Sequence, residues 1–221
     1  MNKFRYHIII GLFLFASNFI VAQDSEPKLR TLIGNGHKMD HGGWGAPTLM
    51  YSRILDQDAL LVGIRGGWLV DHRLTIGIAG YGLISEVNNP AYDQYLLEQG
   101  NPVEEKSRFQ TGYGGLLIEP IIAYSSPIHL SLPIIIGAGG FGYTTSYYDR
   151  DAETHPYDHL KGGHSYFVLE PGVDLELNIF PLLRLGLGAS YRFTSDLDME
   201  ATPADALQGW NGSMAIKIGA F

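Results

Sequence analysis

The residues best suited to chemistry are three acids in the stretch Tyr166–Phe180, YFVLEPGVDLELNIF. Glu170, Asp174 and Glu176 share one parity, and successive side chains of a strand point to opposite faces, so a strand would carry them on one face. The other parity is apolar: Phe167, Leu169, Val173, Leu175, Leu177 and Ile179. A solvated surface strand, a metal-binding sheet and a strand lying against a membrane all fit this pattern. The rest of the sequence is needed to decide which of these three interpretations applies.

Histidines form a second candidate site. His155, His159 and His164 lie in one polar segment that also holds several carboxylates. Imidazole and carboxylate groups can together bind a divalent metal. The segment lacks the compact ligand spacing of known metal motifs, which favours a solvated acidic loop. We therefore predict no metal and no other cofactor, and keep the three histidines as weak metal candidates.

A glycine run, GAGGFG over 137–142, matches the dinucleotide-binding pattern G-x-G-x-x-G. That site requires a strand before the glycines and a helix after them. The following residues, YTTSYY, are typical of a strand. The glycines therefore indicate close packing within one strand.

The N-terminus has the three regions of a secretory signal peptide. Lys3 and Arg5 precede the short apolar core Ile8–Phe15, and Ala22 stands at a plausible cleavage point. The apolar core is shorter than the ~20 residues of a membrane-spanning helix. We expect residues 1–22 to be a cleaved signal peptide.

The mature chain is expected to hold a polar N-terminal arm over residues 23–43 and one domain over 44–221. Removing the two basic residues of the signal leaves 13 basic residues against 23 acidic ones, a net charge near −10. This balance excludes a nucleic-acid partner, which needs a basic surface. The chain has no cysteine, so an exported form would be held together without disulfides.

Strands dominate the expected secondary structure. No segment has a convincing helical period, although 92–99 would tolerate a helix, and alternation of apolar and small or polar residues marks eight strands. Their expected ranges are 44–53, 59–70, 73–85, 109–124, 128–146, 164–180, 183–194 and 209–221.

The connections between these strands differ in length. Those at 71–72, 125–127 and 181–182 are tight, and the first, 54–58, is also short. The other three are long, polar and acidic, and cover 86–108, 147–163 and 195–208. Long loops alternating with short turns, and strands near the ~9–11 residues of a tilted membrane strand, are typical of transmembrane β-barrels. Both chain ends would then lie on the periplasmic side.

The two faces of the strands suit such a barrel. Large aliphatic side chains fill one face, while glycine, serine, threonine and a few charges fill the other, and side chains just fill the interior of an eight-stranded barrel. Unpaired interior charges would be costly, so we expect a salt-bridge network that fills and closes the lumen, with Glu170 opposite or diagonal to Arg192. The alternative is a gated polar passage or small-ligand site. The expected network comprises Arg65, Glu119, Glu170, Asp174, Glu176, Arg184, Arg192 and Lys217.

Aromatic residues lie near both ends of the expected strands, where membrane barrels carry interface belts. The predicted interface residues are Trp68, Tyr124, Tyr143, Tyr166, Phe180, Tyr191 and Trp210.

The sequence resembles the small outer-membrane β-barrels of the OmpA/OmpX type. The features that carry this resemblance are the signal ending in VAQ, the eight alternating segments, the alternation of long loops and short turns, and the terminal Phe221. The resemblance implies an all-β fold: an eight-stranded antiparallel up-and-down transmembrane β-barrel with short periplasmic turns and long extracellular loops. It implies a place in the outer membrane of a Gram-negative bacterium. It also implies contact with outer-membrane lipid and with the barrel-insertion machinery, for which Phe221 would be the insertion signal.

Two features depart from that class. Phe221 shares its parity with Lys217 and Gly219 and not with the apolar positions of its strand. Prolines interrupt four expected strands, and each removes a ladder donor, which leaves the local register open. They are Pro47, Pro120, Pro133 and Pro171.

Lipid A deacylases are outer-membrane barrels that carry an H-x-S pair facing the membrane, and His129 and Ser131 fit that spacing. The pair lies beside the short turn at 125–127, whereas a deacylase needs it near the outer leaflet, and no supporting carboxylate is evident. We therefore expect no enzyme activity.

The expected function is that of a non-enzymatic outer-membrane protein with an envelope-structural or surface-interaction role, whose acidic loops contact an extracellular partner or ions. A narrow, porin-like pore for small solutes and a lipid-modifying enzyme are the alternatives. A soluble exported barrel of lipocalin type is the rival fold.

Overall fold

The computed structural model describes residues 40–100, 106–145 and 159–221. The expected signal peptide, most of the expected arm, and two stretches at 101–105 and 146–158 lie outside the described residues, as do the side chains of 145 and 159–162. The first strand begins at His41, three residues before the expected start of the barrel domain.

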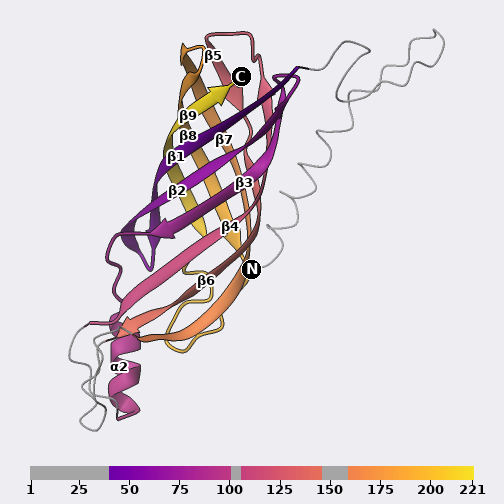
Figure 1. Ribbon diagram of the computed structural model, residues 1–221. Coiled ribbons are helices and arrows are strands. Elements are labelled where there is room, and N and C mark those ends of the chain that lie inside the picture. The colour runs from indigo at the N-terminus through magenta and orange to yellow at the C-terminus, as the bar shows by residue number, and fades with distance from the viewer. Residues whose placement is uncertain (1–39, 101–105, 146–158) are drawn as a thin grey trace, which may run out of the picture. The chain divides into compact units, whose positions relative to one another are not determined.

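The described chain is an all-β antiparallel barrel, as predicted, with one short helix (Figure 1). Its strands are β1 (His41–Ile54), β2 (Gln57–Val70), β3 (Leu74–Leu83), β4 (Arg108–Ile122), β5 (Ile128–Ser131), β6 (Ile134–Thr145), β7 (His159–Phe180), β8 (Leu183–Thr194) and β9 (Gly209–Ala220). β5 and β6 together form one strand that breaks at Leu132 and Pro133, so the nine elements make eight barrel strands.

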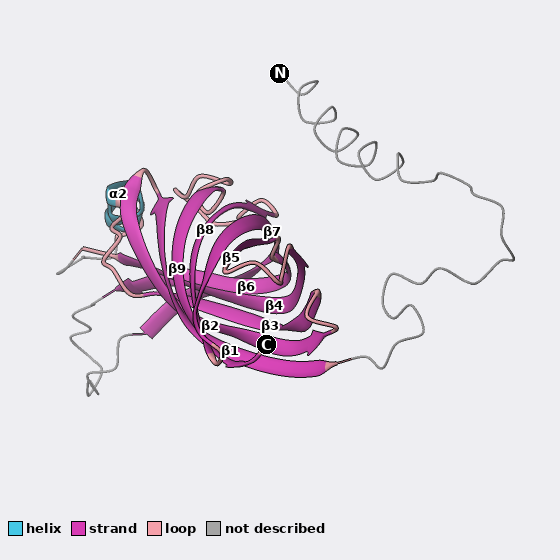
Figure 2. Ribbon diagram, turned by 90° about the horizontal axis from the view of Figure 1, so that it is seen from above, coloured by secondary structure: helices cyan, strands magenta, loops and turns pink. Residues whose placement is uncertain are grey.

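Hydrogen bonding closes the barrel into a ring (Figure 2). Each strand pairs with its neighbours in sequence, and the first strand pairs with the last from Gly43 opposite Ala220 to Tyr51 opposite Gly212. A closed ring leaves no open sheet edge, which is what the hydrocarbon region of a membrane requires. In the part of the chain that the structure describes, no helix is long and apolar enough to cross a membrane.

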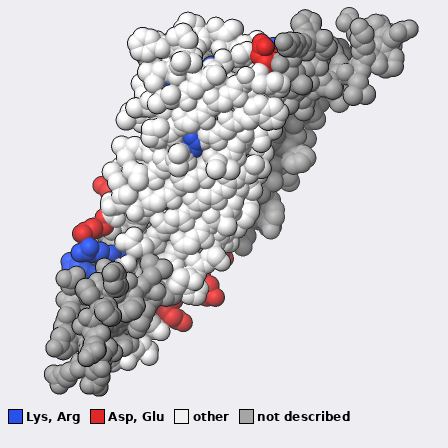
Figure 3. Space-filling view, in the orientation of Figure 1, with Lys and Arg blue, Asp and Glu red and all other residues white. Residues whose placement is uncertain are grey.

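Alternation along each strand decides which side chains fill the interior. In β1, Met50 is 2% exposed while its neighbour Tyr51 is 50% exposed, and the same two-residue period runs through most of the strand. The outward positions carry large aliphatic residues such as Ile64 and Ile78. Figure 3 shows the result on one face: apart from a small basic patch, the wall is free of charged residues, and the other visible charges lie toward its ends.

The prolines interrupt hydrogen bonding without shifting the register. At Pro47 the β1–β9 ladder is interrupted between Gly45 and Thr48, yet the pairing on both sides follows one register. Pro133 separates β5 from β6, and the β7–β8 ladder resumes in register beyond Pro171. The two register shifts fall elsewhere, at Phe141/Tyr143 in the β6–β7 ladder and at Asn178/Phe180 in the β7–β8 ladder.

The turns and loops follow the predicted alternation. β1 and β2 are joined by a two-residue turn, Leu55–Asp56, in which both residues have positive φ, as tight hairpins require. The long β3–β4 connection contains α2 (Pro90–Glu98), close to the stretch that tolerates a helix. β4, β6 and β7 extend beyond the other strands at the end where α2 lies (Figure 1).

Candidate functional site: the charged interior of the barrel

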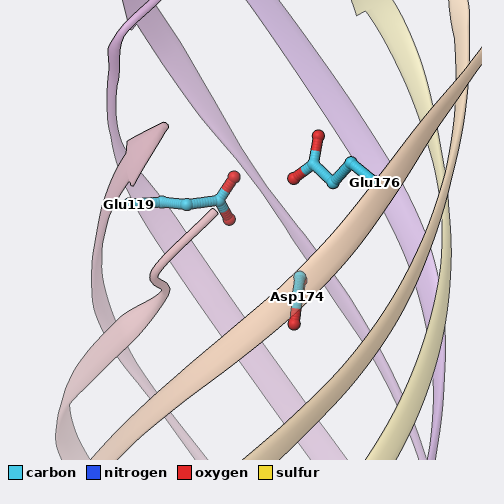
Figure 4. Close-up of side chains that lie close together, drawn as sticks. All are labelled: Glu119, Asp174 and Glu176. Atoms are coloured by element: carbon cyan, nitrogen blue, oxygen red, sulfur yellow. The ribbon is translucent and has the colours of Figure 1, made fainter. Parts of the chain in front are cut away.

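Acidic residues of β4 and β7 meet basic residues of β2 and β9 across the interior. Lys217 of β9 donates its ammonium protons to both Glu119 of β4 and Glu176 of β7. Arg65 of β2 forms an ion pair with Asp174 of β7. The three acids converge on one small region of the interior, as Figure 4 shows.

Glu176 has the most partners. The Ser131 hydroxyl donates to its Oε1 atom at 2.6 Å, and the His129 Nε2 atom lies 3.1 Å from its Oε2 atom. With Lys217 counted, Arg184 is the fourth partner, with Nη1 3.6 Å from the same Oε2 atom. Three strands, β5, β8 and β9, are therefore bound to one carboxylate of β7.

Aromatic rings cover the basic residues at the end where β1 begins and β9 ends. The ammonium group of Lys217 lies 4.1 Å from the centre of the Trp44 ring, and the Trp44 Nε1 atom donates to the Thr75 hydroxyl at 3.0 Å. The guanidinium of Arg184 lies 3.8 Å from the centre of the Phe221 ring. Cation–π contacts of this kind strengthen when water is excluded.

Glu170 and Arg192 form a second group, nearer the long loops. The register places them opposite each other, as predicted, yet they form no ion pair. Glu170 instead accepts protons from the Tyr113 hydroxyl at 2.6 Å and the Ser190 hydroxyl at 2.7 Å. Arg192 donates to the Leu207 carbonyl at 2.7 Å and the Ser52 hydroxyl at 3.0 Å. Each of the two charged groups is therefore compensated by hydrogen bonds to neutral groups, namely hydroxyls and one loop carbonyl, and not by the other charge.

The structure thus brings all eight predicted network residues into the interior, four basic and four acidic. Lys217 and Arg192 are 1% exposed and Glu119 is not exposed. Burying a charge without a partner is far more costly than burying a paired one, so the balance of signs is what allows this interior to exist.

Two predicted interface aromatics are not at the membrane surface. Tyr143 and Tyr166 lie on the inward parity of β6 and β7 and are buried. The Tyr143 ring stacks on Tyr92 of α2 with centres 3.9 Å apart, and its hydroxyl accepts from Asn89 at 2.6 Å. The prediction used their position near the long loops, whereas parity decides the face. Tyr143 belongs to a cap over the lumen at the end of the long loops, and the Tyr166 hydroxyl lies 2.9 Å from the Thr111 hydroxyl.

The cap joins the ends of the long strands to two loops. Its members are Val87, Tyr92, Leu96, Phe109, Phe141, Tyr143, Leu197 and Leu207, all buried. Leu207 belongs to the β8–β9 loop, and its carbonyl binds Arg192. The loops therefore close the interior from the side opposite the start of β1 and the end of β9.

The other predicted interface aromatics lie near the ends of the outer wall. Trp68 and Phe180, beside the short turns, are 52% and 65% exposed, and Trp210, at the long-loop end, is 72% exposed. Tyr191 packs edge-on against Trp210, with ring centres 5.2 Å apart. Tyr124 lies in the β4–β5 turn, stacked on His72.

Among the described residues, the group whose geometry could hold a metal is the trio Glu119, Asp174 and Glu176, with one oxygen of each within 4.8 Å of the others. These acids already face Lys217 and Arg65, so the protein's own basic groups compensate their charge. Of the predicted histidine candidates, His155 and the side chain of His159 lie outside the described residues, and His164 is exposed on β7.

The H-x-S pair faces the lumen and not the membrane. His129 and Ser131 are buried in β5, and a carboxylate, Glu176, does contact both, contrary to the sequence analysis. Glu176 lies between them, whereas a catalytic histidine must lie between the carboxylate and the serine to accept its proton. The glycine run at 137–142 lies within β6, as the packing interpretation predicts.

Several partners in this interior were not identified from the sequence. Tyr113, Ser52 and Ser190 each bind a network charge, and Trp44 covers Lys217. Their positions share the inward parity of their strands, which is the signal that could have indicated them. Which hydroxyl meets which charge depends on the register around the whole barrel.

Solved structures with a similar fold are small outer-membrane barrels. Neisserial surface protein A matches with a TM-score of 0.53 and 8% identity, over 83% of this chain and 99% of that chain. The N-terminal β-barrel domain of Pseudomonas aeruginosa OprF gives 0.46 and 8%, over 82% and 99%. A major outer membrane protein from Thermus thermophilus gives 0.43 and 11%, over 80% and 99%.

No protein-family model matches the sequence, and no curated protein matches it. Of these three structures, the first has a TM-score above 0.5, and the fold comparison rests on it. At 8% identity it establishes the fold: this chain has the architecture of a small, eight-stranded outer-membrane β-barrel.

Proposed function

We propose that this chain is a non-enzymatic protein of the Gram-negative outer membrane, exported by a cleaved signal peptide, whose closed barrel holds acidic loops at the cell surface. One observation carries the proposal: the interior is filled by a balanced charge network inaccessible to solvent, with Lys217, Arg192 and Glu119 each 1% exposed or less. A barrel built this way is a scaffold. Its role lies in the envelope or at the extracellular loops, and its partners are outer-membrane lipid and, during assembly, the barrel-insertion machinery.

A narrow pore is the alternative, and conductance across planar lipid bilayers separates the two. The closed-lumen proposal predicts no steady unitary currents from the purified, folded protein. Steady currents that disappear in Arg192→Ala would instead favour a pore, because Arg192 is a charge inside the lumen along which a solute would have to pass.

The geometry at His129 supports the absence of lipid chemistry. A buried serine and histidine that both contact Glu176 have no path to a lipid ester and no base–nucleophile contact. Lipid A extracted from cells that express the protein should have the same mass spectrum as lipid A from cells expressing His129→Ala. A deacylated species present with the wild-type protein alone would overturn this part of the proposal.

A further inference from the structure

A groove interrupts the outer wall of the barrel. It is shallow and open along its length, with a volume of about 630 Å³, and its lining includes Leu49, Tyr51, Leu187, Ala189, Gly212 and Met214. Clefts that bind small molecules enclose roughly 300–1,000 Å³. The groove therefore has ligand-site dimensions, although it lies on a wall that faces lipid.

The groove lies in the extracellular half of the wall. Tyr51 is three residues before the end of β1 at Ile54, which is about 10 Å along a strand. The apolar band of an outer-membrane barrel is about 25 Å tall. Tyr51 pairs with Gly212, and Gly212 pairs with Ala189, so the groove runs across β1, β9 and β8 at the depth of the outer leaflet.

Its shape comes from small residues between large ones. A Cβ atom added to Gly212 would meet no other atom within 4 Å, so the floor is open space. Leu49, Leu187 and Met214 stand beside it, 40%, 53% and 44% exposed. Apolar walls on both sides of an empty floor suit an extended hydrocarbon chain better than they suit a flat protein surface.

A basic residue stands above the groove. Arg53 is exposed, on the same face of β1 as Tyr51 and closer to the extracellular turn. Its guanidinium donates to the Asp56 carbonyl at 2.8 Å and forms no ion pair with any described residue. Asp58, opposite it in the register, instead accepts from the Tyr51 hydroxyl at 2.6 Å. The guanidinium's fork of donors remains available to a phosphate at head-group depth.

We propose that this groove binds an acyl chain of a phosphorylated, multiply acylated glycolipid of the outer leaflet, and that Arg53 contacts the phosphate of the same molecule. The proposal rests on the outer-membrane location given under Proposed function. A second copy of the chain could also cover an apolar wall, but a flat partner surface would leave the floor of the groove at Gly212 empty.

The test compares Gly212→Leu, which fills the floor, with Gly45→Leu. Gly45 lies on the outer face of β1, four residues before Leu49 and nearer the start of the strand, and an added Cβ there also meets nothing within 4 Å. Both variants should therefore fold, which heat-modifiable gel mobility checks. Native mass spectrometry then counts diphosphoryl lipid A retained by each purified protein.

We expect Gly212→Leu to retain about tenfold less lipid A, because two or more methylenes lose their burial, while Gly45→Leu retains as much as the wild type. Arg53→Gln should reduce retention of diphosphoryl lipid A and leave retention of dephosphorylated lipid A unchanged. Equal retention by both glycine variants would overturn the proposal. A dimer abolished by Gly212→Leu, with lipid retention unchanged, would assign the groove to a second copy.

The experiments distinguish a failure of the groove proposal from a failure of the proposed function. If the wild-type protein fractionates with the membrane and shows a folded gel band, while Gly212→Leu binds lipid A normally, the groove proposal alone fails. If the wild-type protein is found in the aqueous phase, the membrane location fails, and the groove proposal with it.

Discussion

Individual charges in this barrel are stabilised by shared partners. Lys217 lies between Glu119 and Glu176, so its removal would leave two buried carboxylates competing for the remaining donors. A buried charge that loses its partner costs several kcal/mol, whereas replacing a whole pair with neutral groups is often nearly neutral. The network is thus better described as mutual compensation than as a source of stability.

The first prediction concerns Lys217→Met. The change should lower the free energy of unfolding by about 3–5 kcal/mol, because Glu119 and Glu176 both lose the ammonium group. Urea titration of the folded gel band in detergent measures it. Lys217→Met combined with Glu119→Gln should recover part of the loss, and a double variant that is less stable than the single one would contradict the pairing.

The second prediction concerns Glu170→Ala. The Tyr113 and Ser190 hydroxyls would lose their acceptor, which should cost about 1–3 kcal/mol. Glu200→Ala, in the exposed part of the β8–β9 loop, is the matched control and should change stability by less than about 0.5 kcal/mol. The same urea titration compares them, and equal, negligible losses would mean that Glu170 carries no interior contact of importance.

At the scale of elements, the cap depends on one asparagine. The Asn89 Oδ1 atom accepts from the backbone N–H groups of Ala91 and Tyr92 and so caps α2. Its Nδ2 atom donates to the Tyr143 hydroxyl at 2.6 Å and to the Ala201 carbonyl at 2.9 Å. A single side chain therefore joins the helix, β6 and the β8–β9 loop.

The third prediction follows from that position. Asn89→Ala should destabilise the cap by about 0.5–2 kcal/mol, the usual cost of losing an N-cap. We expect faster cleavage of the β3–β4 and β8–β9 loops by an added protease, while the folded barrel band survives unchanged. Gln94→Ala, on an exposed turn of the same helix, should leave the cleavage rate unaltered. Loss of the barrel band itself in Asn89→Ala would show that cap and barrel are one cooperative unit.

How far the sequence predicts this structure differs from element to element. Strand order, turn positions and the inward face of residues such as Glu176 follow from two-residue alternation, since parity alone decides the face. Alternation does not predict which interior side chains bind each other. Glu170 and Arg192 are opposite in register, and yet each forms hydrogen bonds with other groups. Tyr143 shows the same limit, because proximity to a loop indicates depth but not face.

At the scale of the whole molecule, one physical requirement links the fold to its setting. The outer wall carries large apolar side chains and the interior carries charges, which is the reverse of a soluble protein. Exposed apolar patches beyond a few hundred Å² are rare on soluble monomers, and a band of them around a closed barrel matches a lipid environment. A soluble barrel of lipocalin type would have the opposite arrangement.

Cell fractionation combined with gel mobility tests this central claim most directly. We predict that the full chain, expressed in a Gram-negative host, sediments with the outer membrane and needs detergent for extraction. The unheated sample should also migrate differently from the heated one, because a closed barrel resists unfolding in detergent. Recovery of the protein in the aqueous phase, with one mobility before and after heating, would contradict the membrane barrel.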